Sequence, residues 1–209
     1  MTLRIPTLSL ALSVTLLLGC GGGASAPVIA PAPATGLAYV DPAGSGWRLV
    51  KDPSSTDTRL VLALVGPAGT PSRGVGFNLQ AAESLAFQKF DNDQYLEDAG
   101  RYDLLSAADD PTEPVAMAGG VKPGNVLSVG LYQKDRAKSA KDSGAPLCRI
   151  ALALTQPTAR PAGANLELRV LKAKIIPSDI GVPTDSAFTL DQKLRMAPIS
   201  VAVGTLTTR

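Results

Sequence analysis

The chain has 209 residues, and its 20 lysines and arginines nearly balance its 18 aspartates and glutamates, which gives a formal charge of +2. This balance, without a basic stripe, argues against a nucleic-acid partner. The sequence contains no histidine, which excludes serine–histidine and cysteine–histidine nucleophiles and histidine-ligated zinc or iron. With one tryptophan, four tyrosines and four phenylalanines, the chain has few rings for a sugar-stacking carbohydrate-binding module.

Residues 1–19 have the layout of a signal peptide. Arg4 supplies the early charge, and Leu8–Leu18 is an apolar stretch. This stretch is shorter than the roughly 20 residues that cross a hydrocarbon core, but its length is typical of a signal peptide. The stretch ends in Leu17–Cys20, with the sequence LLGC. This ending resembles the lipobox of bacterial lipoproteins.

The lipobox resemblance implies cleavage before Cys20, attachment of diacylglycerol to its thiol, and acylation of the new amino group, for example with palmitate. Several acyl chains together make a stable anchor in a lipid bilayer. Gly21 follows the cysteine, which resembles the pattern of lipoproteins that are sorted to the outer membrane. The expected location is therefore the cell envelope, facing the periplasm or the exterior. The alternative is an ordinary secreted protein.

Residues 20–36 are expected to form a tether between this anchor and a folded domain. Three glycines follow Cys20, and Pro27, Pro31 and Pro33 stiffen the remainder toward polyproline II. The composition of the segment offers nothing for a hydrophobic core. The remaining residues, 37–209, have the length of one domain.

Apolar residues at every second position dominate this domain, as in half-buried β-strands. Cys148, Ile150, Leu152 and Leu154 share one face of such a strand, and Arg59–Val65 is apolar on both faces, as in a central strand. Seven further strands are expected at Trp47–Val50, Gly74–Gln80, Leu85–Phe90, Arg101–Leu105, Val126–Gln133, Leu166–Val170 and Ile199–Leu206.

Turn signals rich in glycine and proline separate these strands. The pattern predicts an all-β fold, either a jelly-roll or an immunoglobulin-like sandwich of about nine strands. One or two short helices are expected, at Ala81–Leu85 and at Leu190–Met196, with Thr189 as an N-cap for the second.

Cys148 is the only thiol that remains if Cys20 is acylated, so an intrachain disulfide is not expected. Two interpretations are open, a reactive thiol and a small hydrophobic residue of the core. The alternation around Cys148 favours the core.

The acidic stretch Asp91–Asp98 raises the question of a calcium site. Asp91 and Asp93 could supply two of the six to eight oxygen ligands that calcium takes. An EF-hand is excluded, because Tyr95 lies where a ligand belongs and the central glycine is missing. A surface turn without metal is the simpler interpretation, and no cofactor is expected elsewhere.

The run Lys134–Ser143 contains charges of both signs between two expected strands. Its simplest interpretation is a solvated loop. A loop of this length could also present Lys134, Arg136, Lys138 and Lys141 to a partner.

The order of strands in the middle of the chain resembles that of cohesins, whose domain is a jelly-roll sandwich. The resemblance rests on Arg73–Gln80, Glu83–Phe90, Asn125–Tyr132, Pro146–Leu154, Leu166–Lys174 and the turn Ser178–Asp179. Because cohesins bind dockerins, the resemblance implies protein recognition on a sheet face. No dockerin-contact motif carries over residue by residue. The layout of the whole chain also resembles that of proteobacterial lipoproteins.

No catalytic motif stands out, since no GxSxG, P-loop or GxGxxG follows an expected strand. We therefore expect a membrane-anchored envelope lipoprotein that is not an enzyme and acts as a protein-binding or assembly module. One alternative is a structural lipoprotein without a dedicated ligand. The remaining alternatives are a carboxylate-based hydrolase, because the spacing of paired carboxylates is a property of the fold, and a carbohydrate-binding module.

Replacing Cys20 by Ser is expected to release the protein from the membrane fraction and to abolish metabolic labelling with lipid, because the thiol is the attachment point. Fractionation and labelled fatty acid measure both effects. Wild-type protein that stays in the aqueous phase of a detergent partition would contradict the anchor.

Overall fold

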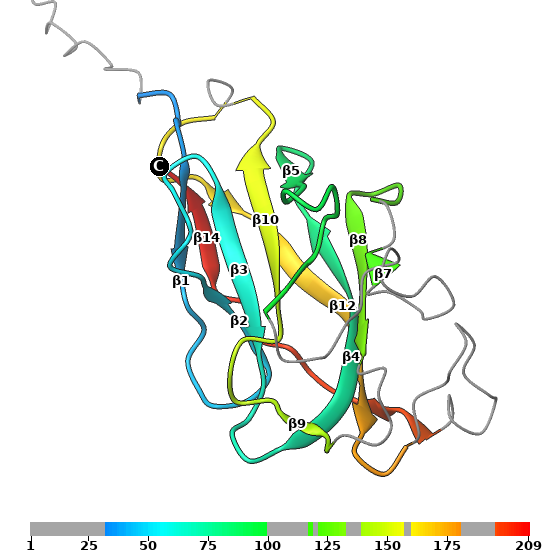
Figure 1. The fold of residues 1–209 in the computed structure, drawn as a ribbon. Helices are drawn as coiled ribbons and strands as arrows, with labels where there is room; N and C mark the ends of the chain where they lie inside the picture. The colour runs from blue at the N-terminus through cyan, green and yellow to red at the C-terminus, as the bar shows by residue number, and fades with distance from the viewer. Residues whose placement is uncertain (1–31, 100–116, 119–120, 133–138, 157–159, 181–194) are drawn as a thin grey trace, which may run out of the picture. The chain divides into compact units, whose positions relative to one another are not determined.

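A computed structural model describes residues 32–99, 117–118, 121–132, 139–156, 160–180 and 195–209 (Figure 1). The chain divides into two units, 1–30 and 31–209, and all the described residues belong to the second. The expected signal peptide, Cys20 and the tether up to residue 31 lie outside the described residues. No helix in the described part is long and apolar enough to cross a bilayer.

The described residues form an all-β fold, as the sequence predicts. Nine of its strands have four or more residues, and five are two-residue pairings. The strands are β1 (Leu37–Val40), β2 (Arg48–Lys51), β3 (Leu60–Val65), β4 (Pro71–Ala81), β5 (Leu85–Gln88), β6 (Glu97–Asp98), β7 (Met117–Ala118), β8 (Val126–Tyr132), β9 (Lys141–Asp142), β10 (Cys148–Leu154), β11 (Asn165–Leu166), β12 (Leu168–Pro177), β13 (Ala197–Pro198) and β14 (Thr205–Thr208).

These strands pair into three antiparallel sheets. The three-stranded sheet has the order β1-β14-β11, and the five-stranded sheet has the order β2-β3-β10-β5, with β6 paired to β10. The six-stranded sheet has the order β13-β12-β4-β8-β7, with β9 paired to β4. Most neighbours in a sheet are far apart in sequence, such as β3 and β10 or β4 and β12, as in Greek-key and jelly-roll sandwiches.

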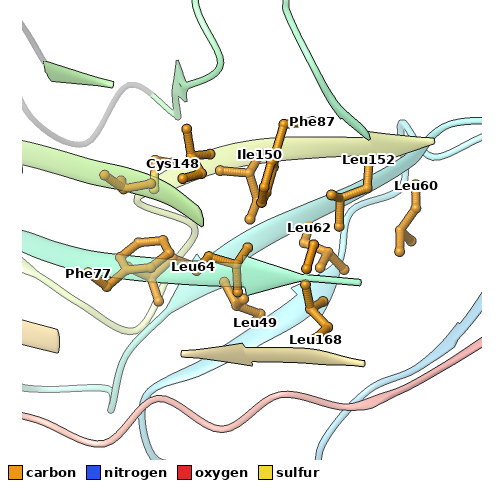
Figure 2. Packing of buried hydrophobic residues seen from close by; sticks show 14 of the residues in the cluster. Leu49, Leu60, Leu62, Leu64, Phe77, Phe87, Cys148, Ile150, Leu152 and Leu168 are labelled. Carbon is orange, nitrogen blue, oxygen red and sulfur yellow. The ribbon is translucent and has the colours of Figure 1, made fainter. Parts of the chain in front are cut away.

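The five-stranded and six-stranded sheets pack face to face over one hydrophobic core (Figure 2). Alternate residues of β3 and β10, among them Leu62 and Ile150, point toward Phe77 of β4 and Leu168 of β12. The three-stranded sheet contributes Leu206 and others to the same core. This packing confirms the sandwich that the period-two pattern predicts.

Cys148 lies in this core with 1% of its surface exposed. Burial, with a smaller contribution from the charge of Asp98, raises the pKa of its thiol to about 12. A thiol in such surroundings is a poor nucleophile. The prediction that Cys148 is a core residue is therefore confirmed.

Tyr39 joins three segments at one edge of the sandwich. Its hydroxyl donates a hydrogen bond to the carbonyl oxygen of Leu49 (2.9 Å) and accepts one from the backbone N–H of Gly204 (2.7 Å). A Cβ at position 204 would lie 1.9 Å from the carbonyl oxygen of Val40. Only glycine therefore lets the chain before β14 approach β1 this closely.

Residues 33–36, the last part of the expected tether, belong to the fold. Ala34 is fully buried, and its N–H donates to the carbonyl oxygen of Arg160 (2.8 Å). The N–H of Arg209 donates to the carbonyl oxygen of Gly36 (2.8 Å). Backbone hydrogen bonds hold this segment against the domain. Every residue type except proline can donate them, so a Gly/Ala/Pro composition does not predict them.

The helix expected at Ala81–Leu85 is wrong. β4 continues to Ala81, and the chain then turns, with the N–H of Leu85 donating to the carbonyl oxygen of Ala82 (2.9 Å), before β5 begins at Leu85. The strand expected at Arg101–Leu105 lies outside the described residues, and so do residues 190–194, which make up most of the second expected helix.

The side chain of Asn125 holds the turn between β4 and β5. Its amide nitrogen lies 3.2, 2.8 and 2.9 Å from the carbonyl oxygens of Ala81, Ala82 and Leu85. The residue has a φ of 52°, in the left-handed region that asparagine tolerates better than most residues. Asn125 therefore fixes how β8 begins beside the end of β4.

Replacing Asn125 by Ala is expected to lower the free energy of unfolding by about 1–3 kcal/mol, because buried carbonyl groups lose their donor. Urea unfolding measures the loss. Asn125→Gly is the control that keeps the left-handed backbone accessible, so its loss reports the side-chain hydrogen bonds alone. If Asn125→Gly unfolds like the wild type, the hydrogen bonds do not hold this turn.

Candidate interaction surface

The outer face of the six-stranded sheet is formed by every second residue of β12, β4 and β8, since the alternate residues fill the core. The pairing of the three strands aligns these outward residues in rows. The rows are Arg169–Gln80–Val126, Lys172–Asn78–Ser128, Lys174–Gly76–Gly130 and Ile176–Gly74–Tyr132.

The β12 end of three rows is a column of basic side chains, Arg169, Lys172 and Lys174, which we call the basic column. All three residues are exposed. Arg169 donates to Gln80 Oε1 (2.7 Å) and lies 3.3 Å from the carboxylate of Glu167, but both charged side chains are more than half exposed, so the pair is weak. Within the described residues, neither lysine has an ion pair.

A β-bulge interrupts β12 inside this column. Val170 pairs with Leu79 and Lys172 with the next residue of β4, Asn78, so Leu171 is the extra residue of β12. Leu171 and Lys172 are consecutive and both exposed, with 46% of the leucine accessible. The bulge therefore keeps Lys172 and Lys174 on the same side of the sheet as Leu171, so that a large apolar side chain lies among three cations on the solvent side.

Two glycines of β4, Gly74 and Gly76, lie in the middle of the face, and the space above them differs. A Cβ on Gly74 would lie 2.7 Å from Tyr132 Cβ and 2.8 Å from Ile176 Cδ1, so only glycine lets these two side chains close over the strand. A Cβ on Gly76 would have one described atom within 4 Å, the carbonyl oxygen of Val129 at 3.4 Å. The side chains of Tyr132 and Ile176 therefore cover the face at Gly74. At Gly76, which pairs with Lys174, no described side chain lies within 4 Å of the Cβ position.

The outer face of the five-stranded sheet has a different character, because Arg149 in its middle is paired with two carboxylates. Arg149 Nε donates to Asp52 Oδ2 (2.7 Å), and Nη1 donates to Glu97 Oε2 (3.1 Å). Burial opposes ionisation of Asp52, but hydrogen bonds from Ser54 and from Arg149 together lower the pKa of this carboxyl. A carboxyl whose pKa is lowered, as that of Asp52 is, is unsuited to the general-acid role of a hydrolase.

Two surface depressions also bear on the hydrolase alternative. The larger, about 560 Å³, is lined in the described part by Glu83 as its only acid, together with Ser84 and Arg160. The smaller, about 330 Å³, has no acid among its described lining residues, and its Arg59 guanidinium lies over the ring of Phe90 at 4.7 Å. Neither holds a pair of carboxylates.

The calcium candidates Asp91 and Asp93 lie in an exposed turn. The carboxylate of Asp93 pairs with Lys89 Nζ at 2.9 Å, and the side chain of Asn92 organises the turn by accepting from the N–H of Gln94 (3.0 Å). In the part of the chain that the structure describes, no group of three or more histidine, cysteine or acidic side chains could hold a metal ion.

The expected interaction loop lies largely outside the described residues, which include neither Lys134, Arg136 nor Lys138. Lys141 is described, and it belongs to β9, which pairs with β4. Ser143 is fully buried, and its hydroxyl lies 3.0 Å from that of Ser72. The end of the run is thus part of the sheet, although the sequence predicts a solvated loop.

Sequence reasoning missed the two lysines of the basic column. The expected strand Leu166–Val170 stops where the alternation breaks, whereas β12 runs on to Pro177. Two consecutive outward residues at a bulge look like the end of a strand in a period-two pattern. The later alternation of Ala173 and Ile175 with Lys174 is the signal that could have extended the strand.

No family model matches the chain, and no curated protein sequence matches it. Among solved structures, the chain is similar to the sixth cohesin of scaffoldin B from Acetivibrio cellulolyticus, solved with a mutant Cel5 dockerin. The identity is 8%, the match covers 77% of this chain and 96% of that one, and the TM-score is 0.48.

Two further solved structures are similar to the chain. The seventh ScaB type I cohesin from Pseudobacteroides cellulosolvens is 12% identical, with 75% of this chain and 84% of that one covered and a TM-score of 0.42. CaCohA2 from Clostridium acetobutylicum is 11% identical, with 75% and 91% covered and a TM-score of 0.44.

Replacing Arg149 by Met is expected to lower the free energy of unfolding near neutral pH by about 1–3 kcal/mol, because the buried carboxylate of Asp52 loses a charged donor. The lowered pKa of Asp52 stabilises the fold above the carboxyl's ordinary value of 3.8, and that contribution is lost as the pH falls through the folded-state pKa. The difference in the free energy of unfolding between Arg149→Met and the wild type should therefore become smaller in acid.

Urea unfolding at about pH 7 and about pH 3 tests this pH dependence. Lys89→Met is the matched control, since it removes an exposed pair with Asp93 and should change little at either pH. If the difference in the free energy of unfolding between Arg149→Met and the wild type is the same at both pH values, the arginine does not lower the pKa of Asp52.

Proposed function

We propose that the chain is an envelope lipoprotein, anchored through Cys20 to the outer membrane, whose domain is a non-catalytic protein-binding module. The anchor follows from the lipobox resemblance of Leu17–Cys20. The domain then works at a membrane surface, where a tether raises the local concentration of a binding module for its partners.

The contrast between the two outer sheet faces supports the binding function. On one face, Arg149 is paired with Asp52 and Glu97. The basic column of the other face presents Lys172 and Lys174 without ion pairs in the described part of the chain. Exposed, unneutralised charge beside an exposed leucine is the composition of a recognition surface.

A protein partner fits this surface better than nucleic acid. The basic column contains three residues on one strand, and the whole chain is close to neutral. Nucleic-acid sites gain affinity by neutralising many phosphates, which takes a longer basic stripe. Stacking aromatic side chains are also few in the sequence.

The second candidate is a structural lipoprotein without a dedicated ligand. The tied-down segment 33–36 favours it, because backbone hydrogen bonds to Arg160 and Arg209 hold the beginning of the domain firmly. The two candidates differ in whether the outer face of the six-stranded sheet meets another protein in the cell.

Site-specific photo-crosslinking in intact cells separates the two candidates. A photoreactive residue in place of Asn78, on the outer face of β4, is expected to give an adduct with one protein. The same residue in place of Thr205, which is exposed on β14, is the control and should give none. Adducts that are absent from both positions, or equal at both, would contradict the protein-binding function.

A further inference from the structure

We infer that Leu171 is the apolar anchor of this surface, and that the partner is an acidic protein segment with a large apolar side chain that packs on Leu171. The inference rests on the proposed protein-binding function and names the chemistry of the partner. It is carried by the β-bulge of β12, the exposure of Leu171 and the charges around it.

The bulge changes which side chains reach the solvent. Strict alternation after the inward Val170 would turn Leu171 outward and Lys172 back into the core. The register shift instead places Lys172 opposite Asn78 on the outer face and Ala173 opposite Phe77 in the core. The outer face thus keeps Leu171 and gains Lys172 beside it, with Lys174 following on the same face.

The lysines and the bulge of β12 have a competing explanation, which is that they protect the edge of the sheet. Among the described residues, β13 pairs with the other edge of β12 at Lys174 and Ile175, and the N–H of Ile199 donates to the carbonyl oxygen of Ala173 (3.1 Å). Charged side chains and bulges on such an edge deter pairing with another chain. This role accounts for the lysines and the bulge, but an exposed leucine at the bulge works against it, because apolar edges invite aggregation.

The position of Leu171 distinguishes it from the other exposed apolar side chains. The large apolar residues exposed in the described part are Val40, Val121 and Leu171. Val40 is more exposed, at 68%, but Asp41 follows it. Leu171 alone lies within the basic column. An apolar contact surrounded by complementary charge gives both affinity and steering in protein recognition.

The charges favour an acidic protein segment over an anionic bilayer. Binding to anionic lipid typically uses clusters of four to eight lysines and arginines. The basic column has three, and Glu167 lies 3.3 Å from Arg169 at one end. Three cations around one leucine match a short acidic segment.

A library of random peptides displayed on phage tests the inference, with the full chain purified in detergent as the target. The selected peptides are expected to be rich in aspartate and glutamate and to contain a large apolar residue. Their affinity should fall about tenfold or more for Leu171→Ser and for the double variant Lys172→Glu/Lys174→Glu.

Matched controls come from the same chain. Val40→Ser removes an exposed apolar side chain elsewhere, and Lys51→Glu/Lys89→Glu makes the same change in net charge at exposed lysines at the ends of β2 and β5, in the five-stranded sheet. Both should keep the wild-type affinity. Urea unfolding confirms that each variant is folded.

Three outcomes would overturn the inference. One is a selection without acidic bias or without any binder that depends on Leu171. Another is equal loss of affinity in the control variants. The third is binding of the full chain to vesicles containing phosphatidylglycerol that is lost in Lys172→Glu/Lys174→Glu, which would assign the basic column to lipid.

Crosslinking distinguishes this failure from failure of the proposed function. If the adduct at Asn78 persists in cells that carry Leu171→Ser with Lys172→Glu and Lys174→Glu, the protein-binding function stands and Leu171 is not its anchor. If the wild type gives no adduct at Asn78, the binding function itself fails.

Discussion

The alternation of side chains along β4 is the constraint on which the rest of the sandwich depends. β4 pairs with β12 on one side and with β8 on the other over most of its length. Its inward residues, such as Phe77 and Leu79, fill the core, and its outward residues set the rows of the exposed face. Because a shift of one residue would exchange the two sets, the core fixes the position of every outward side chain.

Local exceptions to this regularity create the surface features of the domain. The bulge at Leu171 adds a side chain to the outer face, and Gly74 removes one so that Ile176 and Tyr132 can close over the strand. On the opposite sheet, the central Arg149 is instead paired with Asp52 and Glu97. Two faces built from the same kind of strand therefore differ in what they offer to a partner: one has a paired charge cluster at its centre, and the other presents exposed cations beside a leucine.

Sequence reasoning succeeds where a side chain's environment follows from its place in an alternating pattern. It predicts the sandwich, the doubly apolar β3 and the burial of Cys148. It fails where backbone hydrogen bonds decide the structure, as in the turn at Ala82 that replaces an expected helix. It also misses the lysines of the basic column, because the bulge at Leu171 breaks the pattern that would reveal them.

The central claim is that a protein covers the outer face of the six-stranded sheet in the cell. Lysine footprinting with an amine reagent, read by mass spectrometry, tests it most directly in native membranes and again on purified protein. The account predicts that Lys172 and Lys174 are protected in membranes and reactive after purification, while Lys51 and Lys89, at the ends of β2 and β5, react equally in both. Equal reactivity of Lys172 and Lys174 in the two preparations would contradict it.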